Sequence, residues 1–498
     1  MTAPFVSGTL DVGRSLVRGS AWMVGLRWAL RGLGLINTFI LARLLTPADF
    51  GLVAMAMVVI GLVEVMGQFG QGLALIRHKN PTREDYDSVW TLSLIIAAVL
   101  TAVLWSVAPL AALYFHEPRA VGMIELLALR TAVGGLQNVG VYDFRRDLRF
   151  DRDFAYQFIQ RILVVAITIV CAILLRDWRA LAAGILGGQV LGVIASYIMH
   201  PYRPRLCVRR IPDILGFSGW MLAVSIAQYI NGRADQFVVG GIAGPAAMGL
   251  YNVAADAGTA PAMEITLPVT RALFPVFAKI RDDAAAVRGA FLNLFGAVCM
   301  ISIAVGVGTA LVAHDFVAVA LGPRWMAAVP LVRLLAIAGG LYGIMHAAIP
   351  AMSALGHARL SAQVTASRAL SMVAAVAVAA AFGGIETIAW ARVAVTLVFI
   401  PGIFFTIARV LPVSLGDIVE RTWRPLIAGA AMTGAVMAVH AALPAIPPLR
   451  LLGDAAAGAA SYTAALLLLW WLAARPPGLE ATVLARVLPH LRRVLRRR

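Results

Sequence analysis

Arginines inside long apolar runs are the residues of this sequence best suited to chemistry. Arg27 and Arg31 are four residues apart, so a helix places both side chains on one face. The planar guanidinium group binds pairs of oxygen atoms on phosphates and carboxylates. These arginines therefore indicate an anionic ligand. The other arginines in apolar runs are Arg43, Arg130, Arg161, Arg233, Arg333, Arg368 and Arg392.

Acidic residues occupy the same apolar runs but are fewer, and they include Glu64. Asp256 and Glu264 are eight residues apart, which again puts them on one helical face. If partly desolvated, they could hold a coupling proton or a sodium ion. They could instead only neutralise the arginines, and the sequence leaves both interpretations open.

Asp235 follows Arg233 by two residues, so a regular helix would point the two side chains in different directions. A break at Asn231 and Gly232 would bring both to one site. The segment from Asn231 to Asp235 is therefore a candidate gate or hinge.

Three arginines have an alternative explanation. Arg43 is expected near a membrane interface, where its long side chain reaches the headgroups, and this explanation is favoured over a ligand-binding role. For Arg368 and Arg392, a cavity position and packing between helices remain equally open.

The composition shows which elements must position these residues. The chain has 498 residues, of which 61% are hydrophobic and 13% charged, whereas soluble domains are about 25% charged. A bilayer core needs ~20 apolar residues per helix. We predict an all-α membrane protein with about fourteen spans, joined by short loops. Their approximate positions are 20–44, 48–69, 88–114, 121–143, 154–175, 179–200, 214–241, 246–270, 289–313, 327–352, 358–382, 386–409, 424–444 and 452–474.

Basic residues are distributed asymmetrically across these spans. Of the 42 Lys and Arg residues, 28 fall in both tails and the even-numbered connections, five in the odd-numbered connections and nine at membrane depth. The positive-inside rule then places both termini in the cytoplasm. The basic C-terminal sequence LRRVLRRR is typical of a segment near anionic lipid, and it does not indicate a nucleic-acid partner.

Other chemistries find little support in the sequence. The three cysteines are scattered, and His346 and His440 are interpreted as ordinary bundle residues, so no metal site is expected. Neither of the two lysines follows a glycine, so the chain has no P-loop for ATP. No cofactor is expected.

A repeat organises the spans. The stretch PADFGLVAMA at 47–56 recurs as PAAMGLYNVA at 245–254, and each copy follows the first span of a six-span block. An even offset of six spans predicts two parallel repeats, with the substrate path between them. The predicted lobes are residues 1–210 and 211–420, and residues 421–498 add two helices and a basic tail.

These same segments carry a family resemblance. ARLLTPADFGLVAMA, FGQGLALIRHKNPTREDYDSVWTL and NGRADQFVVGGIAGPAAMGLYNVA resemble the polysaccharide exporter family, and FRRDLRFDRDF is similar to its inner-side linker. The likeness covers at least residues 15–290. It implies a Wzx-type flippase of the multidrug, oligosaccharidyl-lipid and polysaccharide exporter superfamily.

The resemblance implies a substrate and a site. The substrate would be an undecaprenyl-pyrophosphate-linked oligosaccharide for exopolysaccharide or O-antigen (lipopolysaccharide) synthesis. Cations would bind its pyrophosphate and amides its sugar hydroxyls. The expected substrate-binding residues are Arg27, Arg31, Arg130, Arg161, Arg233, Gln137, Asn138, Gln228 and Asn231. The residues expected to couple an ion or balance charge are Glu64, Asp235, Asp256 and Glu264.

Expected partners are lipid-linked oligosaccharide, membrane lipids and polysaccharide polymerase or assembly proteins in the bacterial cytoplasmic membrane. Alternatives are a lipid II flippase, which also has fourteen spans, and a small-molecule multidrug or cation antiporter, for which twelve spans and an acidic cavity would be expected. An integral-membrane glycan polymerase or ligase is disfavoured, because such enzymes usually carry a large outer loop and every outer connection here is short.

Overall fold

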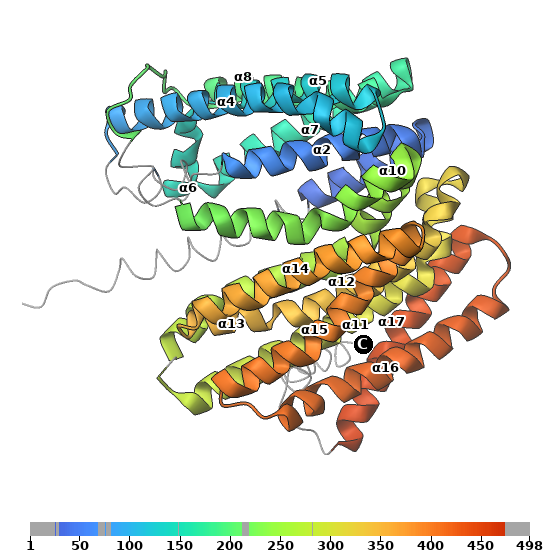
Figure 1. The fold of residues 1–498 in the computed structure, drawn as a ribbon. Helices are drawn as coiled ribbons and strands as arrows, with labels where there is room; N and C mark the ends of the chain where they lie inside the picture. Colours follow the sequence, from blue (N-terminus) through green and yellow to red (C-terminus); the bar gives the residue numbers. More distant parts are fainter. Residues whose placement is uncertain are drawn as a thin grey trace, which may run out of the picture. The chain divides into compact units, whose positions relative to one another are not determined.

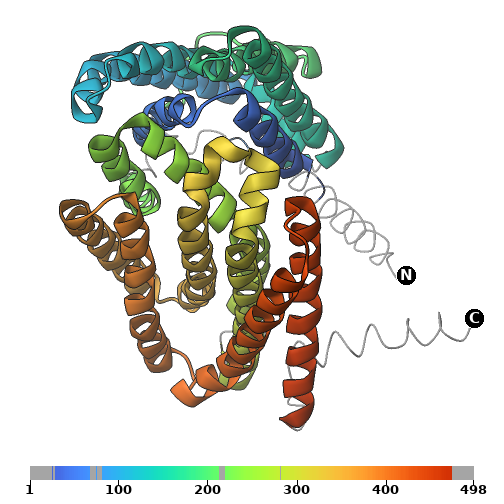
Figure 2. The ribbon, with the colours of Figure 1, turned by 90° about the vertical axis from the view of Figure 1, so that its right-hand side faces the viewer.

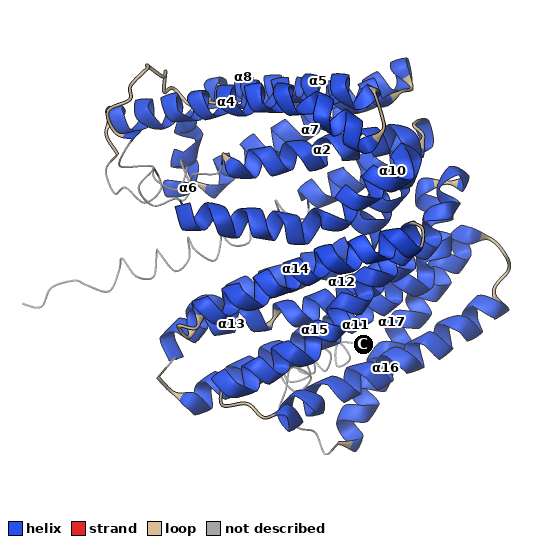
Figure 3. Cartoon of the chain, in the orientation of Figure 1, coloured by secondary structure: helices blue, strands red, loops and turns tan. Residues whose placement is uncertain are grey.

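Helices make up all the regular secondary structure that the computed structural model describes (Figure 3). The described residues are 25, 29–67, 75, 81–147, 149–211, 219–280 and 282–473, and no strand occurs among them. Within them, 11 helices are long and apolar enough to cross a membrane, or up to 12 if a pair bent by 72° forms one span. The predicted all-α polytopic membrane fold is therefore confirmed.

The count of fourteen spans stays a prediction. The first predicted span, 20–44, is described only at residue 25 and over 29–44, where the chain is helical. The seventh and eighth predicted spans lie in one element, α10 (Gly219–Ile280), which has a break inside it. The bent pair consists of Arg119–Gly135 and Val139–Arg146 and covers the fourth predicted span.

The chain forms two compact units, Met1–Gly249 and Leu250–Arg498. The predicted lobe boundary after residue 210 stays a prediction. The helices of the first unit are α2 (Pro47–Met66), α4 (Arg83–Phe115), α5 (Arg119–Gly135), α6 (Asp143–Arg146), α7 (Phe150–Leu175), α8 (Trp178–Met199) and the first half of α10, with a 3₁₀ turn η1 (Val139–Tyr142) (Figure 1).

Small residues let α7 and α8 pack closely. Gly184, Gly188 and Gly192 recur every fourth residue, so they line one face of α8. A Cβ atom on Gly184 would overlap the Thr168 side chain on α7, and one on Gly188 would overlap Val164. This small-xxx-small pattern brings two backbones together in lipid, where apolar burial supplies no driving force between helices.

The second unit contains the second half of α10, α11 (Ala284–Phe316), a π-helical turn η2 (Val317–Leu321), η3 (Pro323–Ala328), α12 (Val329–His346), α13 (Ala348–Ala354), α14 (Ala358–Phe382), α15 (Ile385–Val410), α16 (Leu415–Ala442) and α17 (Pro447–Leu472). α11 contacts α12, α16 and α17. Figure 2 shows α16 and α17 side by side, in red. Fully buried Phe291 and Phe295 centre the core.

The two repeat copies begin their second helix in different ways. Thr46 caps α2: its hydroxyl accepts from the Asp49 amide at 3.3 Å, and the Asp49 carboxylate accepts from the Thr46 amide at 3.0 Å. The matching position is Gly244, which breaks α10 with φ 74° and ψ 179°. Glycine adopts this φ without strain. Pro245 then starts the next helical segment, as Pro47 starts α2.

The expected break at Asn231 and Gly232 is wrong. Gly244 is the residue of α10 with non-helical torsion angles, and the helix runs regularly through 231–235. The physical reason is local: Gly244 precedes a proline, which disfavours helical torsions in the residue before it. Gly232 has no such neighbour.

Matched glycines of the two copies touch reciprocally. In the repeat alignment Gly51 corresponds to Gly249, and Pro47 to Pro245. A Cβ atom on Gly51 would overlap the carbonyl oxygen of Pro245, and one on Gly249 would overlap the carbonyl oxygen of Pro47. The two helix starts therefore cross with backbone against backbone. Reciprocal contacts of this kind are expected when two copies of one element meet about a twofold axis.

Alanine at either glycine is expected to destabilise the protein. Gly→Ala ordinarily stabilises a helix by about 1 kcal/mol, but at Gly51 and Gly249 the added methyl group has no room. Overpacking costs about 1–3 kcal/mol. We expect Gly51→Ala and Gly249→Ala to lower the Tm of the detergent-purified protein. Gly122→Ala in α5 is the control, because nothing lies within 4 Å of its added Cβ. An unchanged Tm in both test variants would contradict the tight crossing.

Candidate functional site

Two cationic side chains lie in one neighbourhood, Arg161 on α7 and Arg31 on the first described helix, 29–44. The Arg161 guanidinium lies so close to Gly34 that a Cβ atom there would be 2.6 Å from Nη2. Arg31, one turn away from Gly34, is close enough to Arg161 to repel its charge. The Nε atom of Arg161 is buried and has no hydrogen-bond partner. An anion would offset this repulsion and would supply an acceptor for the Nε atom of Arg161.

Arg130 on α5, unlike Arg161, forms an ion pair with an acidic side chain of the protein, Glu64 on α2. Its Nη1 lies 3.0 Å from the Glu64 Oε1 on α2, and each side chain is 29% exposed. The hydroxyl of Thr131 donates to the same oxygen at 3.0 Å. Glu64 thus balances a cation at membrane depth.

The first half of α10 brings further polar groups to the first unit. Tyr229 donates to the carbonyl oxygen of Val58 at 2.8 Å, and its ring fills the space beside Gly61. One turn later, Arg233 is exposed and donates to the Gln236 amide oxygen at 2.6 Å. The charge of Arg233 and that of Glu64 both act on Tyr229, so the groups lie in one neighbourhood.

The remaining predicted residues of α10 differ in exposure. Gln228 is exposed, whereas Asn231 is half-buried and its Oδ1 has no hydrogen-bond partner. Asp235 is only 1% exposed and therefore faces away from exposed Arg233. In the second half of the helix, Asp256 is exposed and Glu264 half-buried. Arg27 lies outside the described residues.

Asn138 has a structural role in this arrangement. Its side chain is buried, accepts from the Gly140 amide at 2.9 Å, and donates to the carbonyl oxygens of His200 at 3.2 Å and Tyr202 at 2.9 Å. These bonds occupy both donors of the amide and one acceptor site. Neighbouring Gln137 is half-buried at the end of α5.

A charged network surrounds the predicted inner-side linker. Arg146 lies 2.8 Å from Asp147, and Arg145 lies 3.1 Å from Asp153, so part of the charge of FRRDLRFDRDF is paired within the segment. Arg146 also lies 2.8 Å from Asp143, the residue before the segment. Tyr202 donates to buried Asp87 of α4. Burial, together with this hydrogen bond, raises the pKa of Tyr202 well above its ordinary value. The tyrosine therefore stays neutral at physiological pH and remains a donor.

In the second unit, Arg368 of α14 is stabilised by an aromatic ring. It is 5% exposed, and its guanidinium carbon lies 4.4 Å from the ring centre of Tyr342. A cation over a desolvated ring gains about 2 kcal/mol. This contact accounts for burial between helices, one of the two explanations left open above. Arg43 and Arg333 are exposed, and Arg392 is half-buried.

A comparison with models of protein families shows the family of this chain. Residues 40–330 match the model of the family described as "Polysaccharide biosynthesis protein", which is more than half of the chain. The chain belongs to this family.

Curated relatives extend the match. The chain is 25% identical to the lipopolysaccharide biosynthesis protein WzxC of Escherichia coli K12, over 67% of this chain and 69% of the relative. It is 25% identical to the teichuronic acid biosynthesis protein TuaB of Bacillus subtilis 168, over 74% and 77%. The succinoglycan biosynthesis transport protein ExoT of Rhizobium meliloti 1021 is 26% identical, over 90% and 92%.

Solved structures share the fold of this polysaccharide biosynthesis family member. The lipid II flippase MurJ in an inward closed conformation superposes with a TM-score of 0.74 at 13% identity, over 90% of this chain and 99% of MurJ. An inward-facing multidrug resistance MATE family transporter superposes with a TM-score of 0.57 at 16% identity, over 76% and 94%. At such identities the likeness concerns the fold alone.

Sequence reasoning missed one group of side chains in the second unit. Asp315 of α11, His440 of α16 and Asp454 of α17 come together, although the sequence analysis interprets His440 as an ordinary bundle residue. Asp315 and Asp454 lie in or beside apolar runs where no spacing rule connects them. Only the packing of α11 against α16 and α17 joins the three.

The Arg130–Glu64 pair should show energetic coupling. We expect Arg130→Ala to lower the free energy of unfolding by about 1–3 kcal/mol, since Glu64 keeps its charge without its ionic partner. In the double variant with Glu64→Gln the loss should fall below the sum of the single losses, by about 0.5–2 kcal/mol. Thermal unfolding of the four proteins in detergent measures this coupling.

The exposed pair Arg179 and Asp177 provides the control. Its atoms are 3.8 Å apart and its side chains 67% and 37% exposed, so its coupling should be near zero. Equal coupling in the two pairs would contradict a special role for Glu64.

Proposed function

We propose that this protein moves undecaprenyl-pyrophosphate-linked oligosaccharide repeat units across the bacterial cytoplasmic membrane, for exopolysaccharide or O-antigen synthesis. The observation that carries the proposal is membership in the polysaccharide biosynthesis family. A relative named as a succinoglycan biosynthesis transport protein, aligned over 90% of this chain, supports transport rather than enzymatic synthesis.

Arg31 and Arg161 are the proposed binding residues for the pyrophosphate. Their mutual repulsion, together with the unpartnered Nε atom of Arg161, makes an anionic ligand favourable at this depth. Arg27 would lie on the face of Arg31, four residues away. Exposed Arg233 and Gln228, with Asn231, would add contacts to phosphate and sugar, and Gln137 could add a sugar contact.

Arg130 and Asn138 have lesser roles in this proposal. Arg130 keeps its charge balanced by Glu64 and would reach the substrate only by exchanging that partner. The side chain of Asn138 is committed to backbone atoms. Asp235, Asp256 and Glu264 remain candidates for ion coupling or charge balance.

The proposed mechanism is alternating access. Residues 1–210 and 211–420 would rock against each other and expose the cations first to the cytoplasmic side, where both termini lie, and then to the opposite side. The polyprenyl chain would stay in lipid throughout. Polysaccharide polymerase and assembly proteins would receive the translocated units.

A lipid II flippase is the second candidate, because MurJ shares this fold with a TM-score of 0.74. Its substrate offers the same pyrophosphate chemistry. The curated relatives, named for lipopolysaccharide, teichuronic acid and succinoglycan synthesis, favour the polysaccharide pathway instead. A multidrug antiporter is disfavoured by the excess of intramembrane arginines over acids.

Deletion of the gene in its native host should block surface polysaccharide and leave lipid-linked oligosaccharide on the inner leaflet. Wild-type protein should restore export. Arg31→Ala, Arg161→Ala and Arg233→Ala, at equal protein levels, should reduce it at least about 10-fold, the effect of losing about 1.4 kcal/mol of binding. Quantification of lipid-linked oligosaccharide and surface polysaccharide measures both effects.

Arg179→Ala is the matched control, since this arginine is 67% exposed and lies at a helix start. It should restore export fully. Normal polysaccharide in the deletion strain, with altered resistance to cationic drugs, would overturn the substrate assignment in favour of an antiporter. Loss of cell-wall synthesis would favour lipid II.

A further inference from the structure

Three side chains able to bind a metal ion converge where α11, α16 and α17 pack together. His440 Nδ1 lies 2.7 Å from Asp454 Oδ2 and 3.7 Å from Asp315 Oδ2. One ligand atom from each residue falls within 4.8 Å of the others. The group belongs entirely to the second unit and is separate from the arginines of the proposed substrate site.

The two carboxylates of this group are buried, and one of their oxygen atoms lacks a hydrogen-bond partner. Asp315 and Asp454 are 2% and 1% exposed. Asp454 Oδ1 is buried and has no hydrogen-bond partner. Burying a carboxylate is costly unless it is paired and fully hydrogen-bonded.

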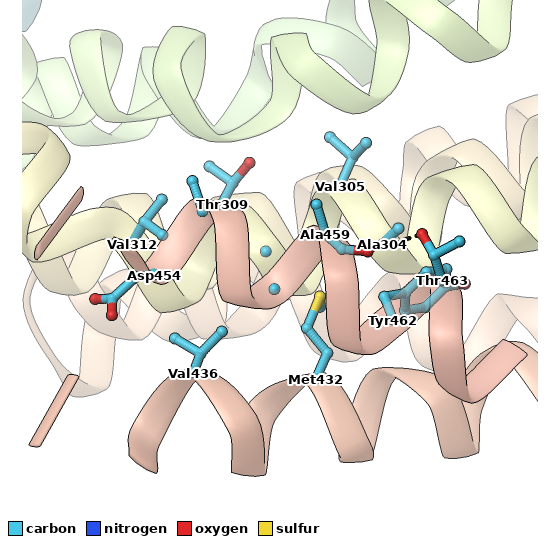
Figure 4. A pocket seen from close by; sticks show the side chains of 13 residues that line it. Ala304, Val305, Thr309, Val312, Met432, Val436, Asp454, Ala459, Tyr462 and Thr463 are labelled. Carbon is cyan, nitrogen blue, oxygen red and sulfur yellow. Dashed lines mark hydrogen bonds between the residues drawn. The ribbon is translucent and has the colours of Figure 1, made fainter. Parts of the chain in front are cut away.

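A cavity of about 450 Å³ lies between the same three helices, and Asp454 stands at one end of it (Figure 4). Apolar residues such as Val312, Met432 and Val436 make up most of the rest of its lining. Asp454 is therefore the charged residue of this lining, and its carboxylate also lies against His440.

We propose that Asp315, His440 and Asp454 bind a divalent transition-metal ion such as Zn²⁺. Ligand atoms about 2.1 Å from one tetrahedral ion are roughly 3.4 Å apart, and the two observed distances, 2.7 and 3.7 Å, lie on either side of that value. An imidazole nitrogen with two carboxylate oxygens is a donor set that Zn²⁺ and Mn²⁺ accept. A fourth position remains for water, because His440 is 40% exposed.

His314 extends the site. Its Nδ1 lies 3.4 Å from the other oxygen of Asp315, and its side chain is 51% exposed. A partner of this kind fixes the orientation of a ligating carboxylate, and losing one typically weakens metal binding by about 10–100-fold. His314 is therefore a positioning residue, whereas Asp315, His440 and Asp454 contact the ion.

The proposed ion would hold α16 and α17 against α11. These two helices lie outside the twelve spans of the predicted repeat. An ion bound only in the folded state stabilises that state by mass action. The site thus serves attachment of the added helices, and its function does not depend on the proposed transport activity.

The test uses the full-length protein, purified in detergent after treatment with a chelator. We expect one equivalent of Zn²⁺ to bind by isothermal titration calorimetry and to raise the Tm. Asp454→Asn, His440→Gln and Asp315→Asn should each weaken binding at least about 100-fold. His314→Gln should weaken it about 10-fold. Mn²⁺ is titrated in parallel, because tighter binding of Mn²⁺ than of Zn²⁺ would indicate that the carboxylate oxygens dominate the site.

Matched controls are Glu386→Gln, which also converts a carboxylate to an amide, and His357→Gln, which repeats the histidine change; both residues are exposed and belong to the same unit. Both should bind Zn²⁺ as the wild type does. Absence of stoichiometric Zn²⁺ or Mn²⁺ binding in wild type would overturn the proposal, as would unchanged binding in all three ligand variants. Because asparagine and glutamine retain size, the Tm of the metal-free variants shows whether each still folds.

Discussion

The contact between Gly51 and Gly249 is the constraint on which the arrangement of the repeat depends. Each glycine lies against the carbonyl oxygen of the proline that starts the other helix, so a single methyl group at either position would overlap backbone. Backbone contacts of this kind are a main means of holding helices together in lipid, where apolar side chains gain nothing from leaving the solvent. The chain passes into its second unit at Leu250, the residue after this crossing. The predicted duplication would account for the reciprocity of this contact.

Charge at membrane depth sets the second constraint. An intramembrane ion costs roughly 2.5–3.5 kcal/mol, and the described residues meet this cost in three ways. Arg130 pairs with Glu64, and Arg368 lies over Tyr342. Arg161 instead lies near a second cation and keeps an unpartnered nitrogen. Arg368 also keeps a buried Nε atom without a hydrogen-bond partner and lies near Arg392, so what distinguishes it from Arg161 is its contact with the Tyr342 ring. Anion binding at Arg161 is the proposal that follows from this difference.

Local patterns in the sequence predicted the helical membrane fold and the repeated corner, because apolar length and the Pro–Gly spacing are properties of adjacent residues. The same patterns failed where distant segments decide the outcome. Asn138 looks like a ligand-binding amide, but backbone atoms of His200 and Tyr202, more than sixty residues later, occupy it. The helix break expected at Asn231 and Gly232 lies instead at Gly244, where the following proline disfavours helical torsions. Asp315, His440 and Asp454 share no spacing and meet only through packing.

Translocation by the purified protein tests the central claim most directly. The measurement follows a polyprenyl-pyrophosphate-linked oligosaccharide in both leaflets of proteoliposomes, using a membrane-impermeant reagent that modifies only the outer-leaflet glycan. It is made with and without proton and sodium gradients. With wild-type protein, nearly all of the glycan should become accessible over time, and Arg161→Ala should slow this at least about 10-fold, or about 1.4 kcal/mol. If the wild-type protein leaves the inner-leaflet glycan unmodified under every gradient, so that only the glycan initially in the outer leaflet reacts, the account is contradicted.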